Sequence, residues 1–175
     1  MKLTTDRLIL NPLSENDRFF ILELVNTAGW IKFIGDRNVH SEIDAIAYIN
    51  KINNNPNVKC WTVQLKTTNV SIGLITFIKR DYLEHNDIGF AFLPSYFGVG
   101  YAFEATKEVL NFLVTHHPLS QILATTIPEN TKSIALLKKL GLRFEKSIEI
   151  ENEILHVYQS STENLLLSDQ LIIPN

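Results

Sequence analysis

The 175-residue sequence has a single cysteine, no long apolar run and no cluster of basic residues. Because Cys60 has no second cysteine to pair with, an intrachain disulfide is excluded and a reducing, cytosolic setting is favoured. No apolar run approaches the roughly 18 residues that a membrane-spanning helix needs, and the N-terminus lacks the basic-then-apolar pattern of a signal sequence. We therefore expect a cytoplasmic protein with no membrane partner, in which the Cys60 thiol, beside Trp61, is a buried structural group.

The charge balance excludes further classes of partner. The formal net charge is −3, which provides no broad positive field for nucleic acid. Any affinity for an anion must therefore come from local backbone geometry. The five histidines and Cys60 show none of the spacings typical of metal ligands, so we expect no metal site.

The sequence is rich enough in apolar residues to build a core. They make up 45% of the chain, which excludes disorder for its body, and the length fits one domain. The expected order is strand, two helices, three strands, helix, strand, helix and two strands. This order indicates an α/β (or α+β) domain with a mixed, mostly antiparallel sheet of about six to seven strands and about four helices. The expected strands cover residues 8–10, 60–65, 70–79, 87–92, 122–127, 142–150 and 153–159, and the expected helices follow Ser14, Ser41, Gly100 and Asn130.

The stretch from Asp87 to Glu104 carries the clearest functional signal, with the sequence DIGFAFLPSYFGVGYAFE. Pro94 ends a strand because proline has no N–H to donate to a sheet. Gly98 and Gly100 then precede a long helical pattern, and glycine permits both a left-handed backbone and the close approach of a ligand. Successive N–H groups in such a turn, followed by a helix N-terminus, form a binding site for an anion such as phosphate. The alternative is a tight strand-to-helix turn without a ligand, because two glycines alone are weak evidence.

The turn does not match the common nucleotide-binding fingerprints. A P-loop requires a lysine directly after its last glycine, and no lysine follows either glycine here. A dinucleotide-binding turn requires a third glycine where this chain has Phe103. The phosphates are therefore not expected to be those of ATP or NAD.

Two further segments form an ordered set of motifs with the glycine turn. Residues 94–105 read PSYFGVGYAFEA, residues 128–141 read PENTKSIALLKKLG, and residues 5–10 read TDRLIL. The first resembles motif A of the GNAT N-acetyltransferases, in the form P-x-Y-W-G-x-G-Y-A-T-E-A that is typical of the RimJ/RimL-type branch. The second resembles the branch's N-x-x-S-I-x-x-L-x-K-L-G-F, and the third resembles its T-x-R-L-x-L start. The matches span nearly the whole chain in the right order.

The resemblance implies a GNAT-type fold over residues 1–160, with acetyl-CoA as the cofactor. Residues 161–175 would form a tail that packs on the domain or on a partner subunit, in a monomer or a homodimer. The main chain of Phe90, Ala91 and Phe92 would line the pantetheine arm. The loop that would hold the diphosphate consists of Phe97, Gly98, Val99, Gly100, Tyr101 and Ala102. Phe103 stands where the branch usually has threonine, which removes one hydroxyl contact to phosphate.

The same resemblance suggests the catalytic groups. Asp87 matches the carboxylate that several GNAT families use as a general base through water, and Ser133 matches a serine that protonates or hydrogen-bonds the leaving thiolate. Asn130 would cap a helix and also contact pantetheine. Asp87 could instead be a solvated carboxylate at a loop end, and Ser133 a first-turn helix residue. Leu137 occupies the position of a tyrosine found in many GNAT enzymes, which leaves a tyrosine acid without a counterpart here.

The acceptor is expected to be a primary amine on a protein or peptide N-terminus or on a small molecule. Trp30, Phe33 and Ile34 fall in the region that covers the acceptor site in this branch, and His156 falls on a strand that carries substrate-facing residues. All four have an alternative role, which is core packing for the first three and a surface or core position for His156.

Two rival functions stay open at this point. An aminoglycoside- or polyamine-type acetyltransferase would need an acidic acceptor pocket, because such substrates carry several positive charges. The acidic residues available for it are Asp36, Glu42, Asp44, Glu84, Asp87, Glu149 and Glu151. The other rival is a catalytically silent CoA-binding module.

Overall fold

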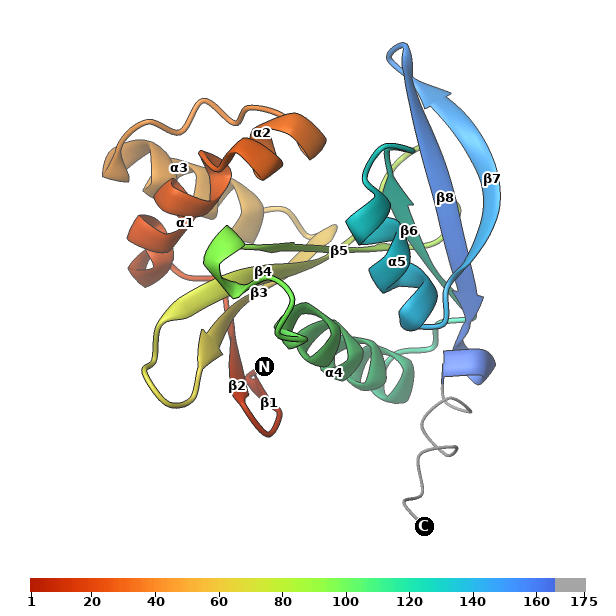
Figure 1. The fold of residues 1–175 in the computed structure, drawn as a ribbon, viewed down its shortest axis with the longest axis horizontal. Coiled ribbons are helices and arrows are strands. Elements are labelled where there is room, and N and C mark those ends of the chain that lie inside the picture. The colour runs from red at the N-terminus through yellow and green to blue at the C-terminus, as the bar shows by residue number, and fades with distance from the viewer. Residues whose placement is uncertain (166–175) are drawn as a thin grey trace.

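One mixed, twisted sheet organises residues 1–165, the part of the chain that the computed structural model describes (Figure 1). Its eight strands lie in the order β1-β2-β3-β4-β5-β6-β8-β7. Every neighbouring pair is antiparallel except β5 and β6, which are parallel. The strands are β1 (Leu3–Thr4), β2 (Leu8–Pro12), β3 (Val58–Leu65), β4 (Ser71–Ile78), β5 (Asp87–Phe92), β6 (Gln121–Thr126), β7 (Arg143–Ile150) and β8 (Glu153–Ser161). The predicted mixed, mostly antiparallel sheet is confirmed, and the two-residue β1 is a strand that the sequence does not predict.

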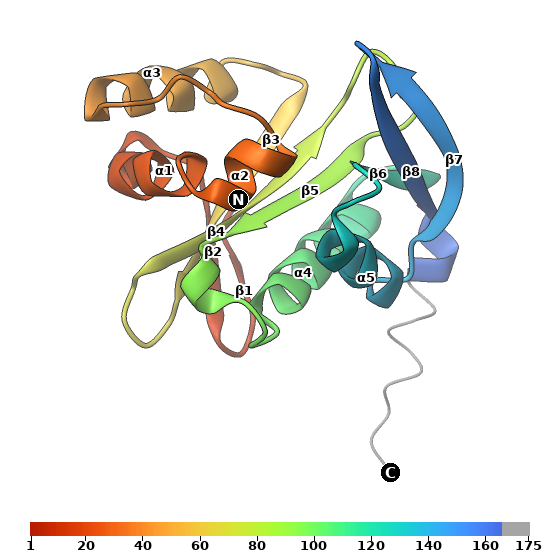
Figure 2. The same cartoon turned by 45° about the horizontal axis from the view of Figure 1, so that its top comes forward.

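Helices cover both faces of this sheet. Figure 2 shows α1, α2 and α3 on one side and α4 and α5 on the other. Each side has its own cluster of buried apolar side chains. The helices are α1 (Arg18–Val25), α2 (Ala28–Phe33), α3 (Glu42–Asn53), α4 (Tyr101–His116) and α5 (Thr131–Lys139), and short 3-10 helices form η1 (Glu15–Asp17) and η2 (Pro94–Tyr96).

Helix α2 is the main element that the sequence does not predict. The residues from Asn26 to Gly29 are typical of a helix end, and α1 does end there, at Val25. Thr27 then begins a new helix because its side-chain oxygen accepts the main-chain N–H of Trp30 at 3.3 Å. Helix α2 is only six residues long and contains Gly29, so its sequence lacks the apolar periodicity that would indicate a helix.

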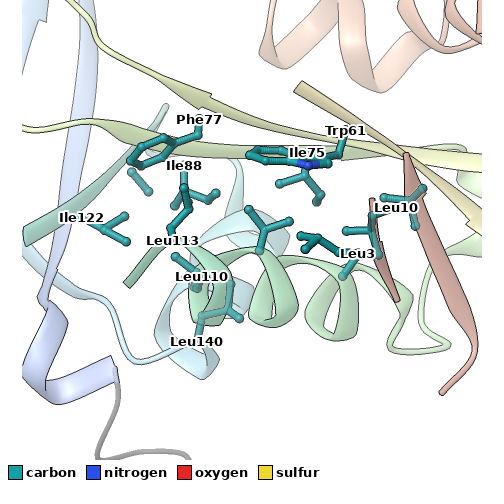
Figure 3. Close-up of a cluster of buried hydrophobic side chains, with 14 of the residues drawn as sticks. Leu3, Leu10, Trp61, Ile75, Phe77, Ile88, Leu110, Leu113, Ile122 and Leu140 are labelled. Carbon is teal, nitrogen blue, oxygen red and sulfur yellow. The ribbon is translucent and has the colours of Figure 1, made fainter. Parts of the chain in front are cut away.

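The core beneath α4 fixes that helix relative to the sheet. Leu110 and Leu113 of α4 pack against Ile75, Phe77 and Ile88 from β4 and β5 (Figure 3). Burying one such side chain stabilises the fold by about 1.5–3 kcal/mol. Helix α4 and strand β5 are therefore held as one unit on either side of the glycine turn.

Cys60 lies in the other cluster, on the side of α1 and α3. It is buried and unpaired, and burial raises the pKa of its thiol above the ordinary value. A thiol that stays protonated and enclosed is a poor nucleophile. The predicted burial of this thiol is confirmed.

Gly73 lies inside β4, where a glycine is typical of a bulge or of the close approach of another group. A Cβ atom added there would lie 2.3 Å from the ring of Phe92 on β5. The ladder between β3 and β4 also shifts register beside Gly73, between Val63 and Gln64. The absence of a side chain at Gly73 lets the Phe92 ring lie across β4.

We expect Gly73→Ala to lower the free energy of unfolding by about 1–3 kcal/mol, because overpacking a filled core forces side chains out of their rotamers. Urea unfolding of the variant measures the change. Gly29→Ala is the matched control, since its Cβ would meet nothing within 4 Å and alanine suits a helix better than glycine. Equal stability of the two variants would contradict the close-approach account.

The start of the C-terminal tail packs on the domain. Leu165 is buried in the cluster beneath α4, and its side chain lies near Gly141. The remainder of the predicted tail, residues 166–175, lies outside the described residues. Among residues 1–165, no helix combines the length and the apolar character that crossing a membrane demands.

Candidate active site

Strands β5 and β6 diverge almost as soon as they meet. Only Asp87 and Leu123 are paired, beside a hydrogen bond of 2.9 Å from the Leu123 N–H to the Asn86 carbonyl. The Leu93 N–H donates to Ile72 on β4, and main-chain groups alternate sides along a strand. The N–H and C=O of Phe90 and Phe92 therefore face the diverging side, whereas those of Ala91 face β4. Of the three residues predicted to line pantetheine, two present their main chain to this opening.

The glycine turn lies at the far end of β5 from Asp87. Gly98 and Gly100 have φ values of +77° and +87°, which are in the left-handed region. Gly100 is the N-cap of α4, so the N–H groups of Tyr101, Ala102 and Phe103 have no acceptor within the helix. Nothing lies within 4 Å of a Cβ added at Gly98, so the turn has open space beside its backbone. These unpaired amides and the positive end of a 16-residue helix fit a diphosphate.

Helix α5 places the other predicted cofactor-binding residues, Asn130 and Ser133, beside the glycine turn. Asn130 is its N-cap, and the Asn130 side-chain oxygen accepts the Ser133 N–H at 3.2 Å, as the predicted cap requires. The Lys132 ammonium lies 5.6 Å from the centre of the Phe97 ring, which is half exposed. The N-terminal ends of α4 and α5 therefore adjoin across the glycine turn. Leu137 is buried in the core beneath α4.

Asp87 is not the solvated loop-end carboxylate of the alternative interpretation. Its side chain is only 2% exposed, and Oδ2 accepts bonds from Arg80 Nε at 2.5 Å and Thr125 Oγ1 at 2.8 Å. Burial raises the pKa of Asp87, and the attraction of Arg80 offsets this only in part. Burial also raises the pKa of the neighbouring Tyr82, partly offset by Arg80, so this phenol stays protonated at neutral pH. These four residues surround the point where β5 and β6 separate.

Sequence reasoning missed the partners of Asp87. Tyr82 lies in a polar segment that the sequence indicates as a surface loop, and Arg80 directly precedes that segment. Thr125 lies in a predicted strand that contains no motif. The Arg80 guanidinium is within 5.8 Å of the centre of the Tyr82 ring. An arginine seven residues before a strand carboxylate is the one signal in the sequence that points to this pairing.

The residues predicted to contact the acceptor do not all come together. Trp30 is buried in the α1–α3 cluster, and its ring N–H has no partner among the described residues. Phe33 is half-buried and Ile34 is 40% exposed at the end of the same helix. By strand alternation Asp87 faces this side of the sheet, with Ala91 and Leu93.

His156 lies on the opposite face of the sheet. Its ring packs on Phe144 at 5.0 Å, and Phe144 also contacts Tyr158, which belongs to the core beneath α4. Val157, the next residue, faces the other way with Leu123. His156 is therefore separated by the sheet from Asp87, and we do not retain it among the acceptor residues.

Three of the seven acidic residues named for a polycation pocket, Asp36, Glu42 and Asp44, already have side-chain partners. Asp44 accepts from Ser41 and His40, and these bonds lower its pKa. Glu42 pairs with Arg18, and Asp36 accepts the Asn38 N–H. In residues 1–165, no three His, Cys, Asp or Glu side chains are grouped as metal ligands would be.

Comparison with known proteins gives a consistent family. Residues 7–143 match the model of the acetyltransferase (GNAT) domain. The uncharacterized N-acetyltransferase YnaD of Bacillus subtilis is 35% identical over 158 residues, which cover 87% of this chain and 91% of that protein. A GNAT-family acetyltransferase structure from Bacillus anthracis is 30% identical, covers 93% of this chain and 99% of that one, and superposes with a TM-score of 0.79.

A more distant structure shares the fold. Spermidine N-acetyltransferase from Vibrio cholerae, in complex with CoA and spermine, has a TM-score of 0.79 at 20% identity and covers 93% of this chain and 99% of its own. The glycine turn, the open edge of β5 and the family match agree. The chain therefore belongs to the GNAT family of acetyltransferases, enzymes whose cofactor is acetyl-CoA.

Proposed function

We propose that the protein is an N-acetyltransferase of the RimJ/RimL type, which acetylates a single primary amine on a peptide N-terminus or a small molecule. This proposal rests on one observation: the left-handed Gly98–Gly100 turn follows a strand, β5, whose main-chain edge is largely unpaired with β6. The turn suits a diphosphate and the edge suits an amide-bearing arm that runs beside it. A thioester at the end of that arm would lie towards Asp87.

The chemistry is a direct transfer in a ternary complex. The amine nitrogen attacks the thioester carbonyl of acetyl-CoA, a C–N bond forms and the C–S bond breaks. CoA leaves as a thiolate, and the one proton that the attacking amine loses balances the one that the thiolate takes up. In the proposed roles, Asp87 takes the amine proton through water and Ser133 donates a hydrogen bond to the departing sulfur. Both Arg80 and Thr125 bond Oδ2 of Asp87, and no described residue donates to Oδ1, which supports a water there.

The electrostatics favour an acceptor with one amine over a polycation. Arg80 places a positive charge beside Asp87. Asp36 and Asp44 accept hydrogen bonds within their own segments, and Glu42 pairs with Arg18 of α1. The Vibrio cholerae neighbour binds spermine, but a polyamine would need several uncompensated carboxylates in one place. A monomer or homodimer in the cytosol is the setting we expect for this enzyme.

A thiol-release assay with acetyl-CoA tests the proposal. We expect turnover with alanyl or seryl peptides or with simple monoamines, and kcat/KM for spermidine at least about tenfold lower, because bringing a second unpaired ammonium beside Arg80 costs about 1–2 kcal/mol at the effective dielectric of a protein surface. A higher kcat/KM for spermidine than for every monoamine would favour the polyamine alternative. CoA binding without turnover of any amine would instead identify a silent module.

A further inference from the structure

A side chain from the other end of the sequence reaches the glycine turn. Arg7 lies in the hairpin between β1 and β2, and its Nη1 donates to the Val99 carbonyl at 3.1 Å. Its Nε donates to Glu104 Oε2 at 2.7 Å, and Nη2 lies 2.6 Å from the same carboxylate. The guanidinium also lies 4.5 Å from the centre of the Tyr101 ring. One side chain thus contacts both sides of Gly100.

The contact with Val99 has a consequence for the next amide. All peptide bonds in the described residues are trans, so the Val99 carbonyl and the Gly100 N–H point in opposite directions. Holding that carbonyl towards Arg7 therefore turns the Gly100 N–H away from Arg7, towards the open side of the turn. The left-handed φ of +87° at Gly100 leaves this peptide unit able to rotate if the carbonyl is released.

The contact with Glu104 has an electrostatic consequence. Glu104 lies in the first turn of α4, where an unpaired carboxylate would repel a bound diphosphate. Thr5 Oγ1 donates to Oε1 of Glu104 at 2.5 Å, and the main-chain N–H of Arg7 donates to the same oxygen at 3.1 Å. The carboxylate is thus neutralised by one arginine and held by two further donors.

Arg7 is itself held in place by the sheet. The Thr5 N–H donates to the Leu8 carbonyl at 3.0 Å, and the Arg7 carbonyl accepts from the Lys66 N–H at 2.9 Å. A residue whose main chain is held beside the start of β2 and the end of β3 can fix the orientation of a loop that has no regular structure of its own.

We propose that Arg7 is a positioning residue of the cofactor site, which orients the Gly100 amide towards the diphosphate and cancels the charge of Glu104 beside it. Arg7 acts through the turn, and no contact between Arg7 and the cofactor is required. Lysine cannot replace it fully, because a single ammonium lacks the planar fork that bonds Glu104 and Val99 together.

The test is CoA binding by calorimetry, with CoA alone, so that the result does not depend on the identity of the acceptor. We expect Arg7→Gln to weaken binding about 10- to 100-fold, the effect of losing a charge-assisted hydrogen bond network. Arg7→Lys should weaken it less. Arg7→Gln with Glu104→Gln should recover part of the loss, because the repelling charge is then gone.

Arg18→Gln is the matched control. Arg18 also pairs with a carboxylate, Glu42, bonds a carbonyl and lies over an aromatic ring, Phe19, but on the far side of the sheet from the turn. It should leave CoA affinity unchanged. CoA binding by folded Arg7→Gln within about twofold of the wild type would overturn the proposal, as would an equal loss in Arg18→Gln. If Arg7→Gln does not fold, Arg7→Lys is measured in its place, and CoA binding by Arg7→Lys within about twofold of the wild type would overturn the proposal.

Discussion

Replacing Gly100 with valine is expected to weaken CoA binding by about 100-fold or more. Gly100 has φ of +87°, and a β-branched residue in such a region costs about 1–3 kcal/mol. The variant would avoid that cost by rotating the turn, which would remove the Gly100 and Tyr101 amides from the proposed diphosphate site. Two lost bonds to a charged group, at about 1.5 kcal/mol each, correspond to a factor of about 100.

Calorimetry with CoA measures this effect, and Gly35→Val provides the control. Gly35 has φ of +98° and open space around its Cβ position, so valine there carries comparable backbone strain. It lies after α2, outside the turn, and should leave CoA affinity unchanged. If Gly100→Val bound CoA as tightly as Gly35→Val does, the backbone of this turn would not be the phosphate site.

Asp87→Asn is expected to change which amines the enzyme can use. A peptide α-amine with a pKa near 7.7–8.0 costs only about 1–1.4 kcal/mol to deprotonate at pH 7, whereas an amine near 10.4 costs about 4.6 kcal/mol. Without a base, turnover of the high-pKa amine should fall about 10²–10⁴-fold. The low-pKa amine should lose less than about tenfold, because positioning alone can supply about 7–11 kcal/mol.

Rates for a series of amines of rising pKa measure this dependence. Asp17→Asn is the control, since Asp17 is also buried and hydrogen-bonded, by Ser14, but lies away from the site. It should lower stability without altering the dependence on amine pKa. An equal loss for every amine in Asp87→Asn would show that Asp87 only holds β5, β6 and Arg80 together.

The dependence of kcat/KM on pH provides a second test of the proposed base role of Asp87. Burial raises the pKa of Asp87 above its ordinary value, against the partial opposition of Arg80 and Thr125. A base must be ionised, so kcat/KM should fall as pH decreases through this raised pKa, at a higher pH than for an ordinary carboxylate. Asp87→Asn should remove that acid limb for high-pKa amines.

The local geometry of the glycine turn and the helix caps can be predicted from the sequence better than the facing of the residues expected near the acceptor. Local signals specify the turn and the caps: two glycines before a helix, and Asn130 three residues before Ser133. These depend on residues close in the chain, so short-range patterns are sufficient. Predicted strand and helix order was likewise correct apart from β1 and α2.

Contacts between residues far apart in the chain could not be predicted from the sequence, for a physical reason. Arg7 and Glu104 are 97 residues apart, and only the folded sheet brings the β1–β2 hairpin to the start of α4. Which face of the sheet the His156 side chain lies on depends on the register of β8. Its partner strand β7 has an irregularity between Phe144 and Lys146. A shift of one residue in a strand reverses every side chain, and no local pattern fixes it.

The most direct test of the account follows the main-chain amides of the turn by NMR during titration with CoA and, separately, with pantetheine, which lacks the diphosphate. We predict that CoA shifts the amide resonances of Gly98, Gly100 and Tyr101 along one binding curve, and that pantetheine leaves them in place while perturbing Phe90 and Phe92. Saturating CoA that leaves the three turn amides unchanged would contradict the claim that this turn holds the diphosphate.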